Sequence, residues 1–252
     1  MHNGSDVKYS DSPVVYIYDG TFDGFLCCVF AAVYSRSIPA GISYEATLLP
    51  SRTIPTDAVK AERVARGIKE KISHAAFDTV RTAFRASAPD RELLLLRFLL
   101  LGFCKGGAVM SMLSHEAVAP VMKMEKAVRN EAHRMKEFVR FSDSGGALTA
   151  VIAPRHDVLE LITAHFSDRL RGEKFLIWDE TRGKAFVYEN GHGGFLFADN
   201  IDIPAPGEEE LAFRRLWKLF YDTVEIKERH NDRCRNTHLP KFYRKNMTEF
   251  KD

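Results

Sequence analysis

The sequence predicts an α+β fold in which a helical N-terminal half packs with a small antiparallel β-β-α-β-β sheet region, followed by a basic helical C-terminal segment. Apolar residues recur with the helical period of 3.6 through most of residues 22–138, the period then changes to two, and Lys and Arg gather after residue 226. We expect a single domain over residues 1–252. Its subregions are residues 1–137, mainly helical with one N-terminal strand; residues 138–203, an antiparallel sheet with one helix; and residues 204–252, the C-terminal helices and basic tail.

The N-terminal strand is predicted at residues 14–18, where β-branched and aromatic residues end at Asp19 and Gly20. An apolar stripe then predicts a helix over residues 22–33, with Asp19 or Thr21 as its N-cap. A strand, a glycine turn and a helix could hold a phosphate. Residues 19–24, however, lack the spacing of the Walker and dinucleotide motifs and carry two acids, which repel an anion. We therefore interpret this turn as structural.

The helices before residue 138 follow from apolar spacing and capping residues. Residues 35–54 are expected to be irregular, because prolines and a glycine interrupt them. The predicted helices are one capped by Thr56 and ending near Ile72, one from Ser73 to Phe84, one capped by Asp90 over residues 92–103, and the longest over residues 116–138. The first of these carries a basic face of Lys60, Arg63, Arg66, Lys69 and Lys71. Such a face could contact a phosphate backbone, but it is more typical of a solvated helix surface.

The change of period after residue 138 predicts the sheet. Strands are expected at residues 138–141 and 147–153 around a turn at residues 143–146, at 175–179 and 185–188, and at 194–198, with a helix over residues 156–170 between the two hairpins. Tight hairpins require antiparallel pairing, so this half is predicted to be α+β and not a doubly wound parallel sheet. An amphipathic helix over residues 208–223 leads to the basic segment.

Composition excludes several classes of protein. A hydrophobic content of 45% and a charged content of 28% are ordinary for a soluble globular chain, and the net charge of +2 is too small for a polyelectrolyte. The four cysteines form no C-x-x-C pair, so a disulfide framework is not expected. Residues 1–6 lack a signal-peptide pattern, and the apolar run at residues 93–103 is too short to span a bilayer. These features predict a cytoplasmic protein without a membrane partner.

Residues 226–246 carry the strongest functional signal. Seven Lys or Arg stand against two acids, and histidines, asparagines and the pair Phe242-Tyr243 are interleaved with them. Guanidinium groups, amides and aromatic faces together suit phosphate contact and base stacking. The alternative is a basic helix pair that only caps the domain and keeps it soluble. The candidate nucleic-acid-binding residues are Arg229, His230, Asn231, Arg233, Arg235, Lys241, Phe242, Tyr243, Arg244 and Lys245.

A second constellation lies at the end of the long predicted helix. Its members, which are also the candidate catalytic residues, are Glu131, His133, Arg134 and Arg140. An acid, a histidine and two arginines at a helix–sheet junction could bind a phosphate or a carboxylate. The same groups could instead form a buried polar network. No nucleophile motif such as Gly-x-Ser-x-Gly is present.

A zinc site in the basic segment would need His230, Cys234 and His238 on one continuous helix. Asn231, Asn236 and Pro240 predict that this helix is broken. We therefore expect neither a metal nor another cofactor.

Three motifs, in this order along the chain, resemble a bacterial domain family of unknown function whose members are labelled probable DNA metabolism proteins. They are the opening residues 16–26, the segment 131–141, and residues 228–233 with 239–243. Asp232 departs from the proline expected at that position. The resemblance implies a partner, because the domain typically accompanies a radical SAM protein suspected of DNA modification or repair, and it is sometimes fused to a uracil-DNA glycosylase-like domain. Neither a glycosylase region nor a three-cysteine radical SAM motif is present in this chain.

The sequence and the resemblance together predict a DNA repair or modification accessory protein that binds nucleic acid, with DNA as the expected partner, and acts with a separate enzyme. An alternative is a nucleic-acid-processing enzyme with its site at the helix–sheet junction. A third hypothesis is an adaptor that holds only a protein partner. Whether the chain is itself an enzyme stays open at this point.

Overall fold

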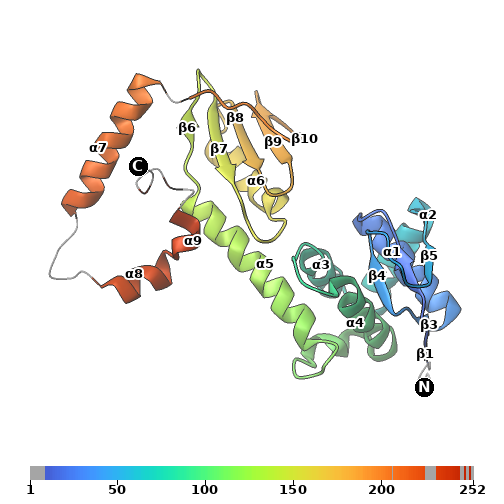
Figure 1. The fold of residues 1–252 in the computed structure, drawn as a ribbon. Coiled ribbons are helices and arrows are strands. Elements are labelled where there is room, and N and C mark those ends of the chain that lie inside the picture. Colours follow the sequence, from blue (N-terminus) through green and yellow to red (C-terminus); the bar gives the residue numbers. More distant parts are fainter. Residues whose placement is uncertain (1–8, 206, 225–230, 245–246, 248–249, 251–252) are drawn as a thin grey trace. The chain divides into compact units, whose positions relative to one another are not determined.

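The structure is a computed structural model that describes residues 9–205, 207–224, 231–244, 247 and 250, with the side chains of residues 221 and 222 outside the description. It is a mixed structure of helices and several small sheets, as the predicted α+β class requires (Figure 1). The chain divides into two compact units, residues 1–129 (unit 1) and residues 130–252 (unit 2). That the whole chain folds as a single domain stays a prediction.

Unit 1 contains two small parallel sheets. Strands β2 (Val15–Ile17), β4 (Gly41–Ser43) and β5 (Ser51–Thr53) form a three-stranded sheet in the order β4-β2-β5, and β1 (Ser10–Asp11) pairs with β3 (Ser37–Ile38). The sequence predicted a single N-terminal strand followed by an irregular region at residues 35–54. Both predictions are wrong, because β3, β4 and β5 lie within that region. Strands of two or three residues are too short to show a period of two, and their pairing is set by contacts distant in sequence.

The helices of unit 1 follow the predicted apolar spacing. They are α1 (Phe22–Ser35), α2 (Ala58–Lys71), α3 (His74–Ala83), α4 (Arg91–Lys105) and the 3₁₀ helix η1 (Gly106–Ser111). Thr21 caps α1 and Ser73 caps α3, each by accepting a backbone N–H three residues later. Asp57 caps α2 in place of the predicted Thr56, because the Thr56 hydroxyl donates to Asp19 at 2.7 Å.

The turn between β2 and α1 is held by its own side chains. Asp19 accepts hydrogen bonds from the backbone N–H and the hydroxyl of Thr21, at 3.0 and 2.7 Å. These bonds keep the pKa of the Asp19 carboxyl below its usual value, although burial opposes that shift. Glycine at position 24 leaves room for this turn, since a Cβ there would lie 2.2 Å from an Asp19 carboxylate oxygen and would displace that side chain. These contacts fit the structural interpretation of the turn.

Helix α4 forms much of the core of unit 1. Leu95, Leu96, Phe98 and Leu99 are fully buried. Residues 91–111, which comprise α4 and η1, are long and apolar enough to cross a membrane by length and composition, a test that the core helix of a soluble protein also passes. The burial of its leucines places α4 among the helices that pack inside a protein.

Unit 2 is built on a five-stranded mixed sheet in the order β10-β9-β8-β7-β6, which Figure 1 shows in yellow and orange. The strands are β6 (Ser142–Asp143), β7 (Leu148–Ile152), β8 (Phe175–Asp179), β9 (Lys184–Glu189) and β10 (His192–Phe197). Pairs β6–β7, β8–β9 and β9–β10 are antiparallel, so the predicted second hairpin and the fifth strand are confirmed.

Two details of the predicted sheet are wrong. Strands β7 and β8 pair in parallel, because the helix between them, α6 (Leu159–Arg169), provides the long crossover that a parallel pair requires. The strand predicted at residues 138–141 does not form. Helix α5 (Ala119–Phe138) continues to Phe138, and β6 begins only at Ser142.

Among the described residues after the sheet, the helices are α7 (Glu208–Val224), α8 (Asp232–His238) and α9 (Lys241–Arg244). Phe175 of β8 lies at the centre of the core of unit 2, stacked on Tyr188 with ring centroids 4.9 Å apart and in edge contact with Phe141. The core thus fixes the segment after α5 against the sheet.

Candidate nucleic-acid interface

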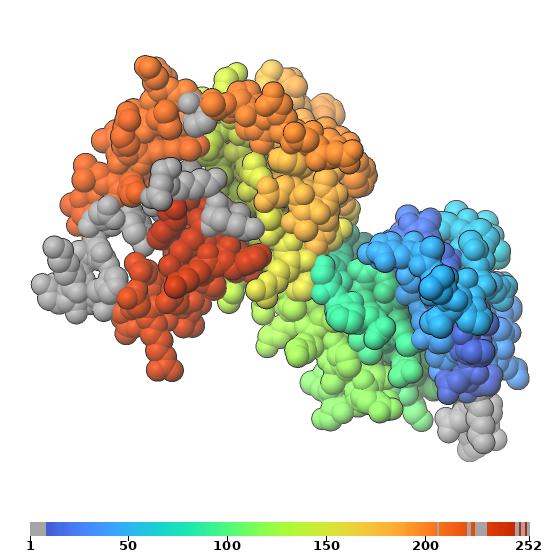
Figure 2. Space-filling view, in the orientation of Figure 1, coloured from blue at the N-terminus to red at the C-terminus, as the bar shows by residue number. Residues whose placement is uncertain are grey.

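Residues 231–244, the described part of the basic C-terminal segment, contain two short helices, α8 and α9. Asn231 caps α8 by accepting the Cys234 N–H at 2.9 Å, and the helix ends at His238, before Pro240. The predicted break is confirmed, and α8 and α9 form the red surface in Figure 2. Within the described part of the chain, no three His, Cys, Asp or Glu side chains gather as metal ligands.

The cations of this segment divide into two groups. Arg235 forms an ion pair with Asp232 at 2.7 Å, and Arg244 donates to the Asn236 side chain at 2.6 Å and to the Leu239 carbonyl at 3.2 Å, which fixes the turn between α8 and α9. Arg233 and Lys241 are exposed to solvent, as are Asn231 and its amide. The remaining candidates Arg229, His230 and Lys245 lie outside the described residues.

The aromatic pair of α9 packs against the body of unit 2. Tyr243 is only 6% exposed, lies 5.8 Å from the Phe138 ring and has the Arg134 guanidinium 5.6 Å from its centroid. Burial raises the pKa of its phenol, and Glu131 adds to the shift. Tyr243 therefore anchors α9 and offers no open face to a base. Phe242 is half-buried with the Arg155 guanidinium 5.0 Å from its ring, so base stacking on Phe242 stays a prediction.

Glu131 organises the loop beside α9. Its carboxylate is 4% exposed and accepts the backbone N–H groups of Arg155 and His156 at 3.0 and 2.7 Å. These two hydrogen bonds tie the buried carboxylate to the loop after β7 and fix the loop backbone. Burial lowers the pKa of His156, and the nearby Arg182 and Arg155 lower it further against the opposing effect of Glu131.

Arg182 secures the other side of the same loop. It donates to the carbonyls of Pro154 and Arg155 at 3.2 and 2.6 Å and forms an ion pair of 2.9 Å with Asp179, whose side chain is fully buried. Burial raises the pKa of the Asp179 carboxyl, while Arg182 opposes that shift. Sequence reasoning missed Arg155, His156 and Arg182. The basic pair directly after β7, at the start of a loop, was the available signal.

The structure gives the four candidate catalytic residues different partners, and their catalytic role stays a prediction. Glu131 faces the loop after β7, and Arg134 faces Tyr243. His133 is exposed, with its Nε2 3.1 Å from a Glu137 carboxylate oxygen. Arg140 donates to the carbonyls of Glu137 and Val139 at 2.8 and 3.4 Å. Neighbouring positions on a helix point in directions about 100° apart, which explains the separation of His133 from Arg134.

A family model described as a domain of unknown function (DUF4130) matches residues 89–249. The chain belongs to this family. No curated protein and no solved structure matches the chain. The matched range contains α4 through α9 and the whole sheet of unit 2, and hence every residue of the candidate interface that the structure describes.

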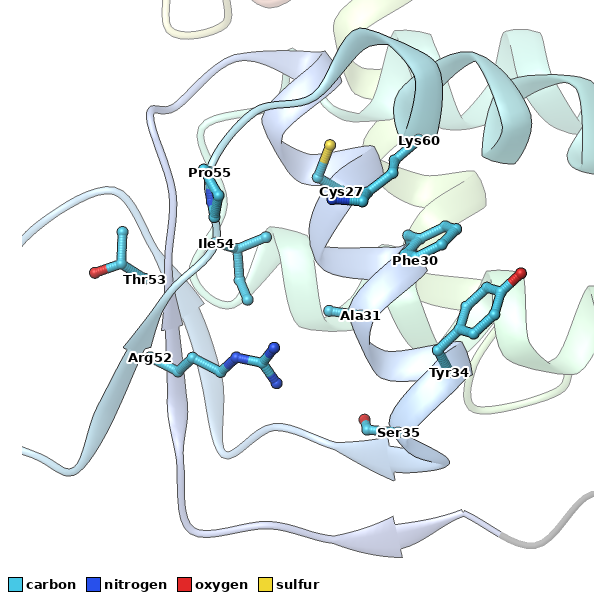
Figure 3. A pocket seen from close by; sticks show the side chains of 10 residues that line it. All are labelled: Cys27, Phe30, Ala31, Tyr34, Ser35, Arg52, Thr53, Ile54, Pro55 and Lys60. Atoms are coloured by element: carbon cyan, nitrogen blue, oxygen red, sulfur yellow. The ribbon is translucent and has the colours of Figure 1, made fainter.

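Both units also contain a cavity. The one in unit 1 has a volume of about 350 Å³ and lies before the family match, between α1, β5 and α2 (Figure 3). Figure 3 shows Arg52 extending from β5 toward α1, which contributes Phe30 and Tyr34. The Cys27 thiol at its edge exchanges hydrogen bonds with the backbone of Asp57 and serves to join α1 to α2. The second cavity, of about 530 Å³, lies in unit 2 within the family match.

Proposed function

We propose that this protein is a DNA repair- or modification-associated accessory protein that binds nucleic acid through α8, α9 and the loop after β7. It would act beside a separate enzyme, and the resemblance of its motifs suggests a radical SAM protein as that partner. Localisation in the cytoplasm belongs to the same proposal. The family itself carries no assigned activity.

The observation that supports the proposal is the gathering of cations from three separate segments around α9. Arg134 of α5 and Arg155 of the β7–α6 loop lie against the rings of Tyr243 and Phe242, which brings them beside the cations of α8 and α9. The acids in this region are committed elsewhere, since Glu131 is buried under two backbone N–H groups and Asp232 pairs with Arg235. Cations with an exposed aromatic edge between them suit a phosphate backbone and its bases.

The test is the affinity for single- and double-stranded DNA, measured by fluorescence anisotropy at several salt concentrations. We expect log affinity to fall linearly with log salt, by about 0.7 to 0.9 for each phosphate contact. The double variant Arg233→Ala/Lys241→Ala should bind more weakly and have a slope smaller by roughly one to two. Phe242→Ala should weaken single-strand binding by roughly 1–3 kcal/mol if the ring stacks on a base.

The matched control is Arg171→Ala/Lys174→Ala, which removes two exposed cations from the loop before β8. Because it removes the same charge from another surface, it should leave the slope close to that of the wild type. DNA affinity that is undetectable at low salt would refute the proposal and favour a protein-binding adaptor. An equal effect of both double variants would assign the binding to overall charge and not to α8 and α9.

A further inference from the structure

The larger cavity of unit 2 lies where the end of α5, the last turn of α6 and α7 meet. Helix α7 is held beside β6 by Arg214, which donates to the Ser142 hydroxyl, so this wall is joined to the sheet. A volume of about 530 Å³ is in the range of small-molecule sites. The lining residues that matter chemically are Arg140, Phe141, Arg169, Phe213, Arg214 and Trp217.

Two aromatic rings of α7 are open at this cavity. Phe213 is 66% exposed and Trp217 is 37% exposed, although large aromatic rings usually gain most stability when they are buried. Phe220 stacks on Trp217 with a centroid distance of 5.6 Å, which supports the indole from the next turn of the helix. Phe141, by contrast, is engaged edge-on by Phe166 and Phe175 in the core. Phe213 and Trp217 thus offer exposed aromatic area on which another planar ring can stack.

Three guanidinium groups from three elements line the same cavity. Arg214 is fixed by Glu210 at 2.8 Å, and Arg140 donates to the backbone carbonyls of Glu137 and Val139. Arg169 extends from the exposed end of α6. The acids of the lining are Glu137 and Glu210, so its three guanidinium groups exceed its carboxylates by one. An anion in this cavity therefore meets a surplus of planar donors that match phosphate geometry.

We propose that this cavity binds a nucleotide, with the base stacked on Trp217 and Phe213 and the phosphate held by Arg169 and Arg140. Flat aromatic area next to guanidinium groups selects a ligand that joins a planar ring to a phosphate. The nucleotide can be a free nucleoside monophosphate or one residue of a strand turned out of its stack. None of the lining residues belongs to α8 or α9, so the proposal does not depend on the interface described above.

The decisive measurement is calorimetric titration of the full chain with each common deoxynucleoside monophosphate, with the matching nucleoside and with inorganic phosphate. A site that recognises both parts should bind the monophosphate at least about tenfold more tightly than either part alone. In a Trp178→Phe background, Trp217 is the single indole, and its fluorescence should be quenched by the same monophosphates.

Two variants test separately the proposed contacts to the base and to the phosphate. Trp217→Ala should weaken binding at least about fivefold, and Arg169→Ala at least about tenfold. The matched controls are Arg171→Ala, which removes a 77% exposed guanidinium two residues away, and Leu219→Ala, which truncates an exposed side chain of α7 outside the cavity. Both controls should bind as the wild type does, and circular dichroism confirms that each variant is folded.

The source of the nucleotide is decided by competition. Displacement of the monophosphate by a single-stranded oligonucleotide assigns the site to a residue within a strand, whereas undisturbed monophosphate binding assigns it to the free compound. Arg233→Ala/Lys241→Ala should leave monophosphate binding unchanged, so failure of the α8–α9 interface and failure of this site are distinguishable. Absence of calorimetric heat and of Trp217 quenching at about 1 mM of every monophosphate would overturn the proposal.

Discussion

Each unit contains a buried glutamate, and the two are held in opposite ways. Glu92 of α4 accepts the Tyr18 hydroxyl at 2.7 Å and forms an ion pair with Arg91. Its partners are side chains that are themselves fixed, since the Arg91 guanidinium lies 4.4 Å from the Phe84 ring centroid. Burial and the bond to Glu92 raise the pKa of Tyr18 well above its usual value. This cluster joins the end of β2 to α4 and completes a core.

Glu131 is buried to a similar extent, but its partners are backbone N–H groups of a loop. The side chains on that loop, Arg155 and His156, remain at least partly accessible. A buried carboxylate is therefore not by itself the mark of a site. A carboxylate that binds side chains stabilises packing, whereas one that binds a loop backbone positions whatever the loop presents.

Among the variants that test this comparison, Glu92→Ala should have the largest effect on the free energy of unfolding. Glu92→Ala leaves the Arg91 charge and the Tyr18 hydroxyl without their shared acceptor, so we expect the free energy of unfolding to fall by about 3–5 kcal/mol. Guanidinium titration followed by circular dichroism measures it. Glu62→Ala, at an exposed position of α2, should change the stability by less than about 0.5 kcal/mol. A loss below about 1 kcal/mol for Glu92→Ala would show that this cluster does not support the core.

Glu131→Ala should have the next largest effect. It leaves two backbone N–H groups unpaired, and because the loop is partly exposed each should cost about 1–2 kcal/mol, so we expect a loss of about 2–4 kcal/mol. Glu131→Gln keeps an acceptor oxygen and should lose less. The distinguishing measurement is DNA affinity in the folded fraction. Glu131→Ala should weaken it by displacing Arg155, whereas Glu92→Ala should not. If the two variants bind DNA with equal affinity, the idea that Glu131 positions a binding loop while Glu92 only supports packing is wrong.

The helices of this fold were predictable because their signals are local. Apolar spacing placed α1, α3 and α7, and the start of α3 at Ser73 was predicted to within one residue. The short strands β3, β4 and β5 and the parallel pairing of β7 with β8 were missed. Both depend on pairing between distant segments, and a two-residue strand leaves no alternation to detect.

The candidate site was predictable only in part. Glu131 and Arg134 both lie near Tyr243, although the sequence grouped them with His133 and Arg140. The grouping was suggested by proximity in sequence, but neighbouring positions of a helix point in different directions, so the side chains have different partners. Arg182 could not be found from its sequence position, because it acts on the loop through the carbonyls of Pro154 and Arg155. Contacts to the backbone leave no trace in residue identity.

The smallest expected effect concerns pH and should belong to unit 2. The pKa of His156 is lowered in the folded protein, chiefly by burial, so the unfolded chain takes up its proton first as the pH falls. The unfolded state then binds more protons, and stability decreases as the pH falls through the ordinary histidine pKa of about 6.5 toward the lower folded value. Above that window His156 is neutral in both states and contributes no pH dependence. Tyr18, with its raised pKa, does not titrate there.

Guanidinium unfolding of the wild type and of His156→Gln at about pH 7.5 and about pH 5.5 measures this effect. The variant should lose less stability than the wild type over that interval. His165→Gln is the matched comparison, since burial also lowers the pKa of His165, but its exposed position in α6 predicts a smaller change of the same sign. Parallel pH profiles of the wild type and His156→Gln would mean that His156 is as well solvated in the folded chain as in the unfolded one. The loop held by Glu131 would then be open to water. The two glutamates would in that case differ mainly in the solvent accessibility of their surroundings, and less in whether they bind backbone or side-chain groups.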